Sequence, residues 1–202
     1  MMLIDSIEQL RALYASPKER AVKKQLPELD KHCRQFIALS PFVVLGSQGA
    51  DDALDASPRG GAPGFVKVTE AGQLLIPDSP GNNRLDTLEN IIHTGRIGML
   101  FIIPGVDETL RVNGHATLTT ATDLLKLCTS ELKPPKLVIQ VDVTQAYLHC
   151  AKAFMRSKLW DTSKQIDRAK LPTMGEMISE QTGMSGPPET QAEMLERYKN
   201  DL

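Results

Sequence analysis

The segment from Ile76 to Ile92, IPDSPGNNRLDTLENII, combines residue types that can hold a phosphate with the local geometry that such a site needs. An apolar strand end, a Pro-Gly-Asn-Asn turn and Arg84 stand directly before an amphipathic helical pattern. Asn82 and Asn83 suit the helix cap, because short polar side chains accept hydrogen bonds from the unpaired amides of a first turn. Free amides, the helix dipole and the arginine would then face the same anion.

The alternative interpretation of this segment is a well-capped surface helix whose arginine extends into solvent. Asp86 and Glu89 favour that alternative, since they already place negative charge near the positive end of the helix dipole. The segment alone leaves both interpretations open.

A second group of residues that could bind a ligand lies in HCAKAFMRSKLW, residues 149–160. On a continuous helix, His149, Lys152 and Arg156 would share one stripe, with Trp160 one further turn along. Two cations and the only tryptophan of the chain could hold an aromatic anion by charge and stacking. The alternative is that Trp160 packs in the core while the two cations extend into water.

Composition limits the function classes without choosing one. The 202 residues carry 23 Lys and Arg against 25 Asp and Glu, so a net charge of −2 supplies no general basic field for nucleic acid. The three cysteines have neither metal-ligand nor CxxC spacing, so we expect reduced thiols and no metal site. No Ser-His-Asp order, paired-carboxylate pattern or HExxH motif offers a separate catalytic apparatus, and the catalytic residue stays unknown.

The chain shows no targeting or membrane signal. The N-terminal residues MMLIDSIEQLRALY contain acids where a signal peptide carries positive charge, and the longest apolar run, residues 97–103, is too short to span a bilayer. We therefore expect a soluble cytoplasmic protein that does not engage a membrane.

Hydrophobic periodicity predicts helices at both ends of the chain and strands in its middle. The expected helices are 7–14, 29–40, 86–94, 149–160 and 189–202. The expected strands are 41–46, 64–69, 73–77, 97–103, 111–118 and 137–144, with 97–103 buried on both faces. In the strand at 111–118, Arg111 and Asn113 share one face while Val112 and Gly114 share the other.

Six short strands with few helices between them favour a small closed or partly closed β-barrel over a parallel doubly wound sheet. The expected fold class is mainly β with flanking helices (α+β). The expected division is N-terminal helices packing on the barrel at 1–40, the barrel at 41–160, and a helical C-terminal extension at 161–202.

Five spaced motifs together resemble one family. They are DASPRGGAPGFV (55–66), LLIPDSPGNNRLDTLENI (74–91), GRIGMLFIIPG (95–105), ETLRVNGHA (108–116) and HCAKAFMRSKLW (149–160). The chain resembles the pyridoxamine 5'-phosphate oxidase-like, FMN-binding split-barrel superfamily over residues 5–180, most closely the branch of probable FMN-dependent enzymes. The resemblance implies a split β-barrel of the FMN-binding type, non-covalent FMN, and a homodimer with flavin sites shared between protomers.

The resemblance also implies a set of cofactor-binding residues. Near the flavin ring it places Val66, Lys67 and Pro77. Near the phosphate it places Arg59, Asn82, Asn83 and Arg84, with Arg111 and Asn113 completing the wall. From the second subunit it implies Lys152, Arg156 and Trp160. Because a cation near the ring stabilises a reduced, anionic flavin, Lys67 and Lys152 are candidates for that role. His115 and His149 are candidates for donating protons, and the alternative for each is a structural hydrogen-bonding histidine.

The C-terminus departs from the family pattern. Pyridoxamine phosphate oxidases end in an Arg/His-rich stretch that grips the substrate's phosphate, whereas this chain ends in ETQAEMLERYKNDL. A vitamin B6 substrate is therefore doubtful. The expected function is an FMN-dependent oxidoreductase that passes hydride or electrons between a small-molecule substrate and a nicotinamide electron donor. The alternatives are a non-catalytic flavin-binding protein for storage or sensing, and a haem-binding split barrel with His149 beside Cys150 as the suggestive ligand pair.

Overall fold

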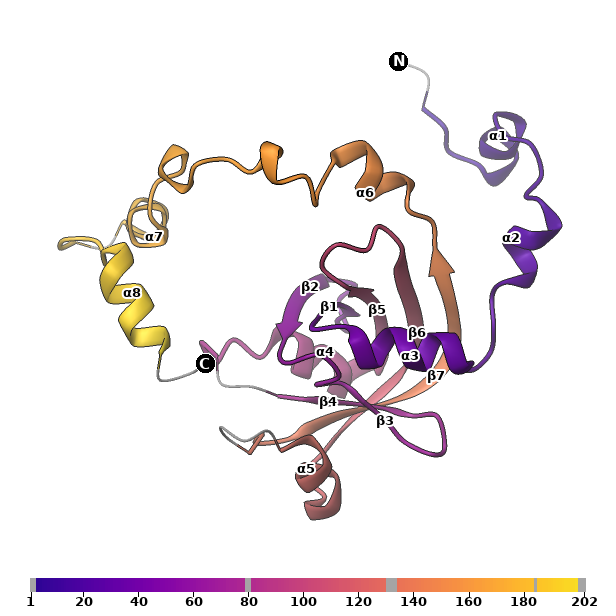
Figure 1. Cartoon of the computed structure of the whole chain (residues 1–202), viewed down its shortest axis with the longest axis horizontal. Helices are drawn as coiled ribbons and strands as arrows, with labels where there is room; N and C mark the ends of the chain where they lie inside the picture. Colours follow the sequence, from indigo (N-terminus) through magenta and orange to yellow (C-terminus); the bar gives the residue numbers. More distant parts are fainter. Residues whose placement is uncertain (1–2, 79–80, 130–133, 184, 200–202) are drawn as a thin grey trace.

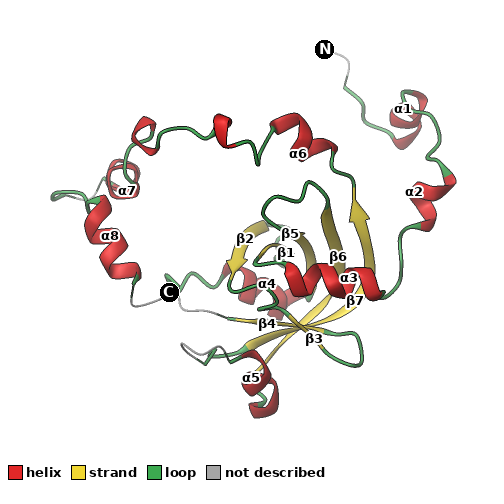
Figure 2. Cartoon of the chain, in the orientation of Figure 1, coloured by secondary structure: helices red, strands yellow, loops and turns green. Residues whose placement is uncertain are grey.

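A computed structural model describes residues 3–78, 81–129, 134–183 and 185–199 of the chain. Its centre is one antiparallel seven-stranded sheet in the order β2-β1-β5-β6-β7-β4-β3 (Figures 1 and 2). The strands are β1 Phe42–Gln48, β2 Leu54–Gly60, β3 Lys67–Val68, β4 Leu74–Pro77, β5 Arg96–Ile102, β6 Thr109–Thr119 and β7 Val138–His149. The helices are α1 Ile7–Ala12, α2 Glu19–Lys23, α3 Lys31–Leu39, α4 Asp86–Thr94, α5 Thr122–Cys128, α6 Lys152–Ser157, α7 Met174–Thr182 and α8 Gln191–Tyr198, with 3-10 turns at Thr162–Lys164 and Arg168–Lys170.

The sheet curls into a half-barrel, so its two edges approach each other. Burial raises the pKa of Asp78, which follows β4, and Arg59 on the edge strand β2 lies close enough for its charge to oppose that rise. These strands are separated by four others in the sheet. The expected fold, a split β-barrel with flanking helices, is confirmed.

Alternating side chains on the central strands fill the inside of the half-barrel. Val43 and Leu45 of β1 and Phe101 of β5 are fully buried, and the residues between them are only half-buried. The prediction that residues 97–103 are buried on both faces is therefore wrong. An antiparallel strand in a half-barrel packs one face on the core and turns the other outward. The almost wholly apolar sequence of β5 therefore contributes to the core with one face and to the outer surface of the sheet with the other.

Helices α3 and α4 close the inside of the half-barrel. Asp30 caps α3 by accepting a hydrogen bond from the Cys33 amide at 2.8 Å, which holds the pKa of Asp30 below its ordinary value, and Ile37 is fully buried. Helix α4 has the predicted bounds of 86–94 and ends at Gly95, whose φ of 65° is left-handed. Leu88 and Ile91 bury its apolar face against the strands.

Strand β7 carries a bulge opposite the middle of β6. The register shifts between Asn113 and Gly114, so that Thr144 is the extra residue on β7. A Cβ on Gly114 would lie 2.3 Å from the Asp142 carbonyl oxygen, so only glycine fits where the two backbones approach. The predicted alternation of 111–118 is confirmed on either side of this position.

Strand β2 has no counterpart among the predicted strands. Its sequence, LDASPRG, is polar and contains Pro58, so it lacks an apolar alternation. The strand forms because it pairs with β1 along seven residues, and an edge strand tolerates proline since one side of its backbone needs no partner.

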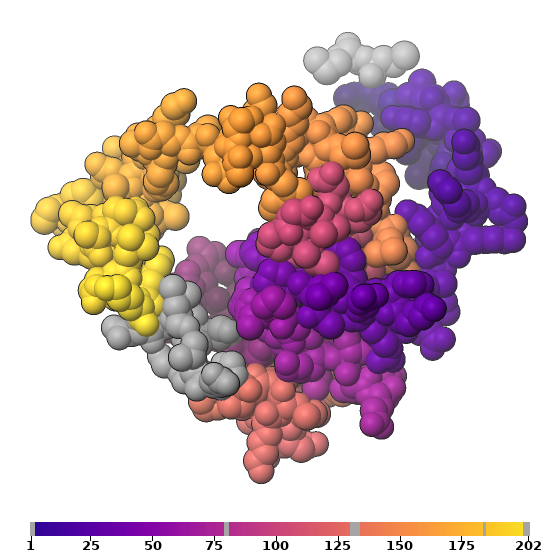
Figure 3. Space-filling model, in the orientation of Figure 1, coloured from indigo at the N-terminus to yellow at the C-terminus, as the bar shows by residue number. Residues whose placement is uncertain are grey.

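The two ends of the chain extend away from the barrel. The four terminal helices α1, α2, α7 and α8 contribute no buried residue. The segment from α6 to α8 arches beside the barrel, and an opening separates this segment from the barrel (Figure 3). Leu26 joins the N-terminal segment to β7 through two hydrogen bonds with Ala146 of 2.9 and 2.8 Å. The division at residues 40 and 160 stays a prediction. Among the described helices, none is long and apolar enough to cross a membrane.

Candidate functional site

Polar side chains line the inner face of β2 at the opening of the half-barrel. Asp55, Ser57 and Arg59 alternate along the strand and are half-buried. Their pairing with β1 places them on the face that carries Val43 and Leu45, so they point toward the inside. We call this region the split edge: these three residues of β2, together with Asp78 and residues 81–87, which lie opposite them.

The turn before α4 differs from the predicted cap. The Asn82 side chain accepts a hydrogen bond from the Arg84 amide at 3.0 Å, and Asn83 adopts a left-handed φ of 59°. An asparagine side chain reaches only two residues ahead here, whereas α4 begins at Asp86, so the prediction that Asn82 and Asn83 cap the helix is wrong. Leu85 occupies the N-cap and offers no side-chain hydrogen bond, which leaves the first-turn amides available to an anion. Pro80 of the predicted turn lies outside the described residues.

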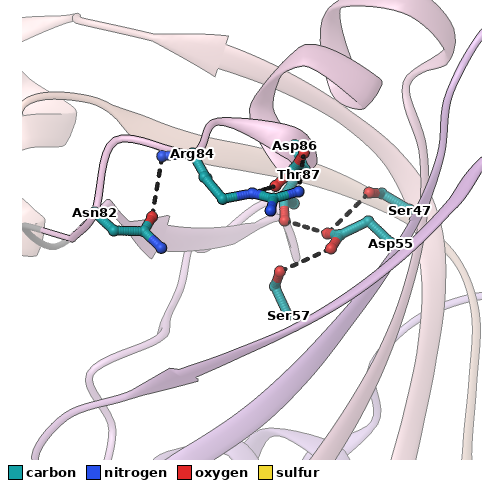
Figure 4. Close-up of polar contacts among 7 residues, drawn as sticks. All are labelled: Ser47, Asp55, Ser57, Asn82, Arg84, Asp86 and Thr87. Atoms are coloured by element: carbon teal, nitrogen blue, oxygen red, sulfur yellow. Dashed lines mark hydrogen bonds and ion pairs between the residues drawn. The ribbon is translucent and has the colours of Figure 1, made fainter. Parts of the chain in front are cut away.

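Arg84 forms a two-pronged ion pair with Asp86 (Figure 4). Its Nε and Nη2 donate to the two carboxylate oxygens at 3.0 and 3.3 Å, and the pair lowers the pKa of Asp86. The pKa of Arg84 is raised, first by Asp86 and further by the charge of Asp55. The two side chains are 75% and 48% exposed, and so exposed a pair is weak enough for an entering phosphate to displace the carboxylate.

Arg59 lies across the split edge from Asp78. Its Nη1 donates to the Pro58 carbonyl oxygen at 2.9 Å. Burial raises the pKa of Asp78 despite the opposing charges of Arg59 and Lys136. A second guanidinium therefore sits at the same opening as Arg84.

The residues implied for the flavin ring lie around β3 and β4. The Val66 side chain is buried in the core at 3% exposure, so only its main chain can meet a ligand. Lys67 is exposed, and its Nζ donates to the Gly64 carbonyl oxygen at 2.8 Å. Pro77 is half-buried and ends β4 opposite Val138 of β7.

The outer face of the half-barrel holds a cavity of about 420 Å³ above β1, β5 and β6. Its floor is flat because Gly46 and Gly98 are direct partners across β1 and β5. We call it the outer cavity; its lining is Val44, Gly46, Gly98, Met99, Leu100, Thr109, Arg111, Asn113, His149, Cys150, Ala153 and Phe154.

Two predicted residues supply the polar wall of the outer cavity. The Arg111 guanidinium lies 5.3 Å from the centre of the Tyr147 ring. Asn113 donates from Nδ2 to the Gln145 side-chain oxygen at 2.6 Å. Because both flank buried residues of β6, they face away from Arg59 and Arg84 on the opposite side of the sheet.

The continuous helical stripe predicted for residues 149–160 is wrong. His149 ends β7, α6 covers only Lys152–Ser157, and Lys158 has a left-handed φ of 51°. The Trp160 Nε1 donates to the Val106 carbonyl oxygen at 3.0 Å, and its ring packs 5.7 Å from that of Phe154. Trp160 thus anchors its own chain beside the outer cavity, while Lys152 and Arg156 remain exposed.

Two groups of predicted site residues can be placed. Arg59, Asn82, Asn83 and Arg84 belong to the split edge, and Arg111 and Asn113 line the outer cavity. Val66, Lys67 and Pro77 lie on or beside β3 and β4. Lys152, Arg156 and Trp160 lie on or after α6, which contributes Ala153 and Phe154 to the outer cavity. Sequence reasoning missed Asp55, Ser57 and Thr87, although the alternation of short polar residues in DASPRG was an available signal. It also missed the paired glycines of the cavity floor, which no local pattern indicates.

No three His, Cys, Asp or Glu side chains come together as a metal site anywhere in the described part of the chain. The potential ligand donors are instead arginines, amides and hydroxyls. That donor set suits a phosphate-bearing organic molecule.

The fold defines a split-barrel protein whose opening carries two arginines and the start of a helix. Residues 29–150, more than half of the chain, match the family described as Pyridoxamine 5'-phosphate oxidase. The chain belongs to this family. No curated protein sequence matches it significantly.

Several solved structures are similar to the barrel. HupZ of Group A Streptococcus is 14% identical, with 59% of this chain and 93% of that chain covered and a TM-score of 0.49. A protein related to general stress protein 26 from Clostridium acetobutylicum is 8% identical, with coverages of 58% and 85% and a TM-score of 0.44. The FAD binding protein from Mycobacterium smegmatis is 13% identical, with coverages of 60% and 94% and a TM-score of 0.42. These identities and TM-scores are too low to support a functional inference.

Proposed function

We propose that this chain binds FMN non-covalently at a homodimer interface and acts as an oxidoreductase. The observation that carries the proposal is the split edge, where Arg84 and the start of α4 lie beside β2, the strand that also carries Arg59, in a chain of the pyridoxamine 5'-phosphate oxidase family. When bound, FMN supplies hydride and electron transfer between a small-molecule substrate and a nicotinamide donor.

The donor set at the split edge fits a phosphate dianion. Such a group needs several donors, and Arg84 can exchange its exposed contact with Asp86 for one with phosphate oxygens. The first-turn amides of α4 add uncharged donors and the positive end of a helix dipole. The chain's own residues thus bind and orient the phosphate.

The arrangement of the two residue groups supports a shared site. The split edge opens to the inside of the half-barrel, whereas Arg111 and Asn113 face outward. One FMN cannot touch both groups of the same protomer, since the sheet lies between them. A two-fold dimer in which each protomer presents both surfaces would complete two identical sites.

Residues near the ring would tune charge and protons. Lys67, held at the Gly64 carbonyl, and Lys152, exposed on α6, are the cations proposed to stabilise a reduced flavin. His149 lines the outer cavity, where a proton donor could reach a ligand, while His115 lies on β6 beside Gly95 and does not line that cavity.

The primary test is the affinity of purified, flavin-free protein for FMN and for riboflavin. Arg84→Ala should weaken FMN binding about 10- to 150-fold and barely change riboflavin binding, because only FMN carries the phosphate that Arg84 contacts. Arg96→Ala is the matched control, an exposed arginine that instead contacts Gln48. No FMN binding by the wild-type protein, or equal losses for both ligands in Arg84→Ala, contradicts the proposal.

Mixing two variants tests the shared site. Arg84→Ala damages the split edge and Arg111→Ala damages the outer cavity, so a heterodimer of the two should hold one intact site. Half of the wild-type number of tight FMN sites is expected in the isolated heterodimer. A heterodimer without any tight site, or a monomer that binds FMN fully, contradicts sharing.

Haem binding is a second candidate function, because His149 and Cys150 both line the outer cavity. A Soret band in the purified protein, or on adding haem, supports it, and flavin absorption supports the first proposal. Reduction of the bound flavin by NADH or NADPH separates an oxidoreductase from a storage or sensing protein.

A further inference from the structure

A carboxylate to which the family resemblance assigned no role lies beside the proposed phosphate site. Asp55 on β2 accepts hydrogen bonds from the hydroxyls of Thr87 at 2.5 Å, Ser57 at 2.9 Å and Ser47 at 3.5 Å (Figure 4). Ser47 in turn accepts from the Asn90 side-chain amide at 3.0 Å. One carboxylate therefore joins β1, β2 and α4.

The hydroxyls around Asp55 need it as their acceptor. Ser47 and Thr87 are only 5% and 3% exposed, so water cannot replace a lost partner without rearrangement. Thr87 is the second residue of α4 and Asn90 the fifth, which places both contacts in the part of the helix next to Arg84. The far end of α4 has its own anchor, since the Thr94 hydroxyl donates to the Gln48 carbonyl oxygen at 2.6 Å.

Asp55 is badly suited to touching the phosphate itself. Its two oxygens already accept from three hydroxyls, and its negative charge would repel a dianion. Its charge does act on Arg84, whose guanidinium is paired with Asp86 (Figure 4). The carboxylate is placed to hold the site rather than to bind the ligand.

We propose that Asp55 is a positioning residue that fixes the first turn of α4 and Arg84 in the geometry that selects a phosphate-bearing flavin over one without phosphate. The proposal rests on the proposed FMN function and adds a residue to it. Its prediction is specific: losing Asp55 should reduce discrimination between FMN and riboflavin without removing any direct ligand contact.

The test compares two substitutions at one position. Asp55→Asn keeps an oxygen for the Thr87 hydroxyl and an amide that the Ser57 hydroxyl can accept from, whereas Asp55→Ala keeps neither. The ratio of riboflavin to FMN dissociation constants should fall about 10- to 100-fold in Asp55→Ala, because small misplacements of donors are costly. Asp55→Asn should restore most of the ratio. Thr87→Val should behave like Asp55→Ala, and Ser57→Ala, which leaves the α4 contact intact, should change the ratio least.

Hydrogen exchange of the flavin-free protein supplies a readout without ligand. Asp55→Ala should speed exchange at residues 85–91 and leave β6 and β7 unchanged. An unchanged dissociation-constant ratio in folded Asp55→Ala, unchanged exchange at α4, or no rescue by Asp55→Asn overturns the positioning role. If the wild-type protein binds no FMN, both the FMN proposal and the Asp55 proposal are overturned. If the wild-type protein binds FMN but the Asp55 variants do not behave as expected, only the Asp55 proposal is overturned.

Discussion

Substitution of Gly98 tests whether the outer cavity is occupied in the FMN-bound dimer, either by the flavin or by the partner protomer. Gly98 lies on the cavity floor opposite Gly46, and a Cβ there would meet the Asn113 side-chain oxygen at 3.2 Å. That neighbour is the end of a side chain that can turn aside. Each Gly98→Val chain should therefore fold normally and place two methyl groups in the cavity.

The two effects of Gly98→Val have different sizes. Glycine inside a strand costs roughly 0.5–1 kcal/mol relative to alanine, and valine favours strands, so the free energy of unfolding should stay within about 1 kcal/mol of wild type. Filling space that a ligand or partner occupies costs about 1–3 kcal/mol, so FMN affinity should fall about 5- to 150-fold.

Urea unfolding and FMN titration, with sedimentation to report the dimer, measure both effects of Gly98→Val. Arg96→Val is the control, since Arg96 lies two residues earlier on the same face of β5 but outside the cavity. Wild-type FMN affinity and dimerisation in Gly98→Val would refute the role of the outer cavity. A large loss of stability would refute the assumption that Asn113 yields.

Two further predictions concern the barrel itself. Burial raises the pKa of the Cys33 thiol from 9.0 to about 11, so the unfolded chain loses this proton at a lower pH than the folded chain. The contribution of Cys33 to the free energy of unfolding should be fully present below pH 9 and should decline as the pH rises from 9 through 11. Urea unfolding at pH 8 and 10.5 should show a smaller decline in Cys33→Ala, and an equal decline would contradict the assignment. Gly114→Ala should lower the free energy of unfolding by about 1–3 kcal/mol, because its Cβ would lie 2.3 Å from the Asp142 carbonyl oxygen. Thr117→Ala, at an exposed position of the same strand, should change it little in the same urea assay.

Some of the fold was predictable from local pattern. Helix α4 has the bounds that its amphipathic pattern predicted, and Arg111 and Asn113 share the outward face of β6 as their alternation indicated. These features depend on neighbours within one helical turn or two strand residues, which a sequence displays directly. The family resemblance, carried by five motifs in order, supplied the split barrel that periodicity had left open.

Other features depended on partners that are remote in the chain. Trp160 leaves the expected helical stripe to donate to a carbonyl 54 residues earlier. Strand β2 exists only because β1 offers seven pairing residues to a polar sequence.

The sequence by itself determined which chemistry this protein can offer: arginines, asparagines and hydroxyls near turns, with no metal-ligand spacing. The tertiary structure alone decided which of them meet. Asp55 and Thr87 are 32 residues apart, and Arg59 and Arg111 lie on opposite faces of one sheet. The physical reason is that the curl of the sheet and the pairing of its strands are set by burial summed over the whole chain, and no local window contains that sum.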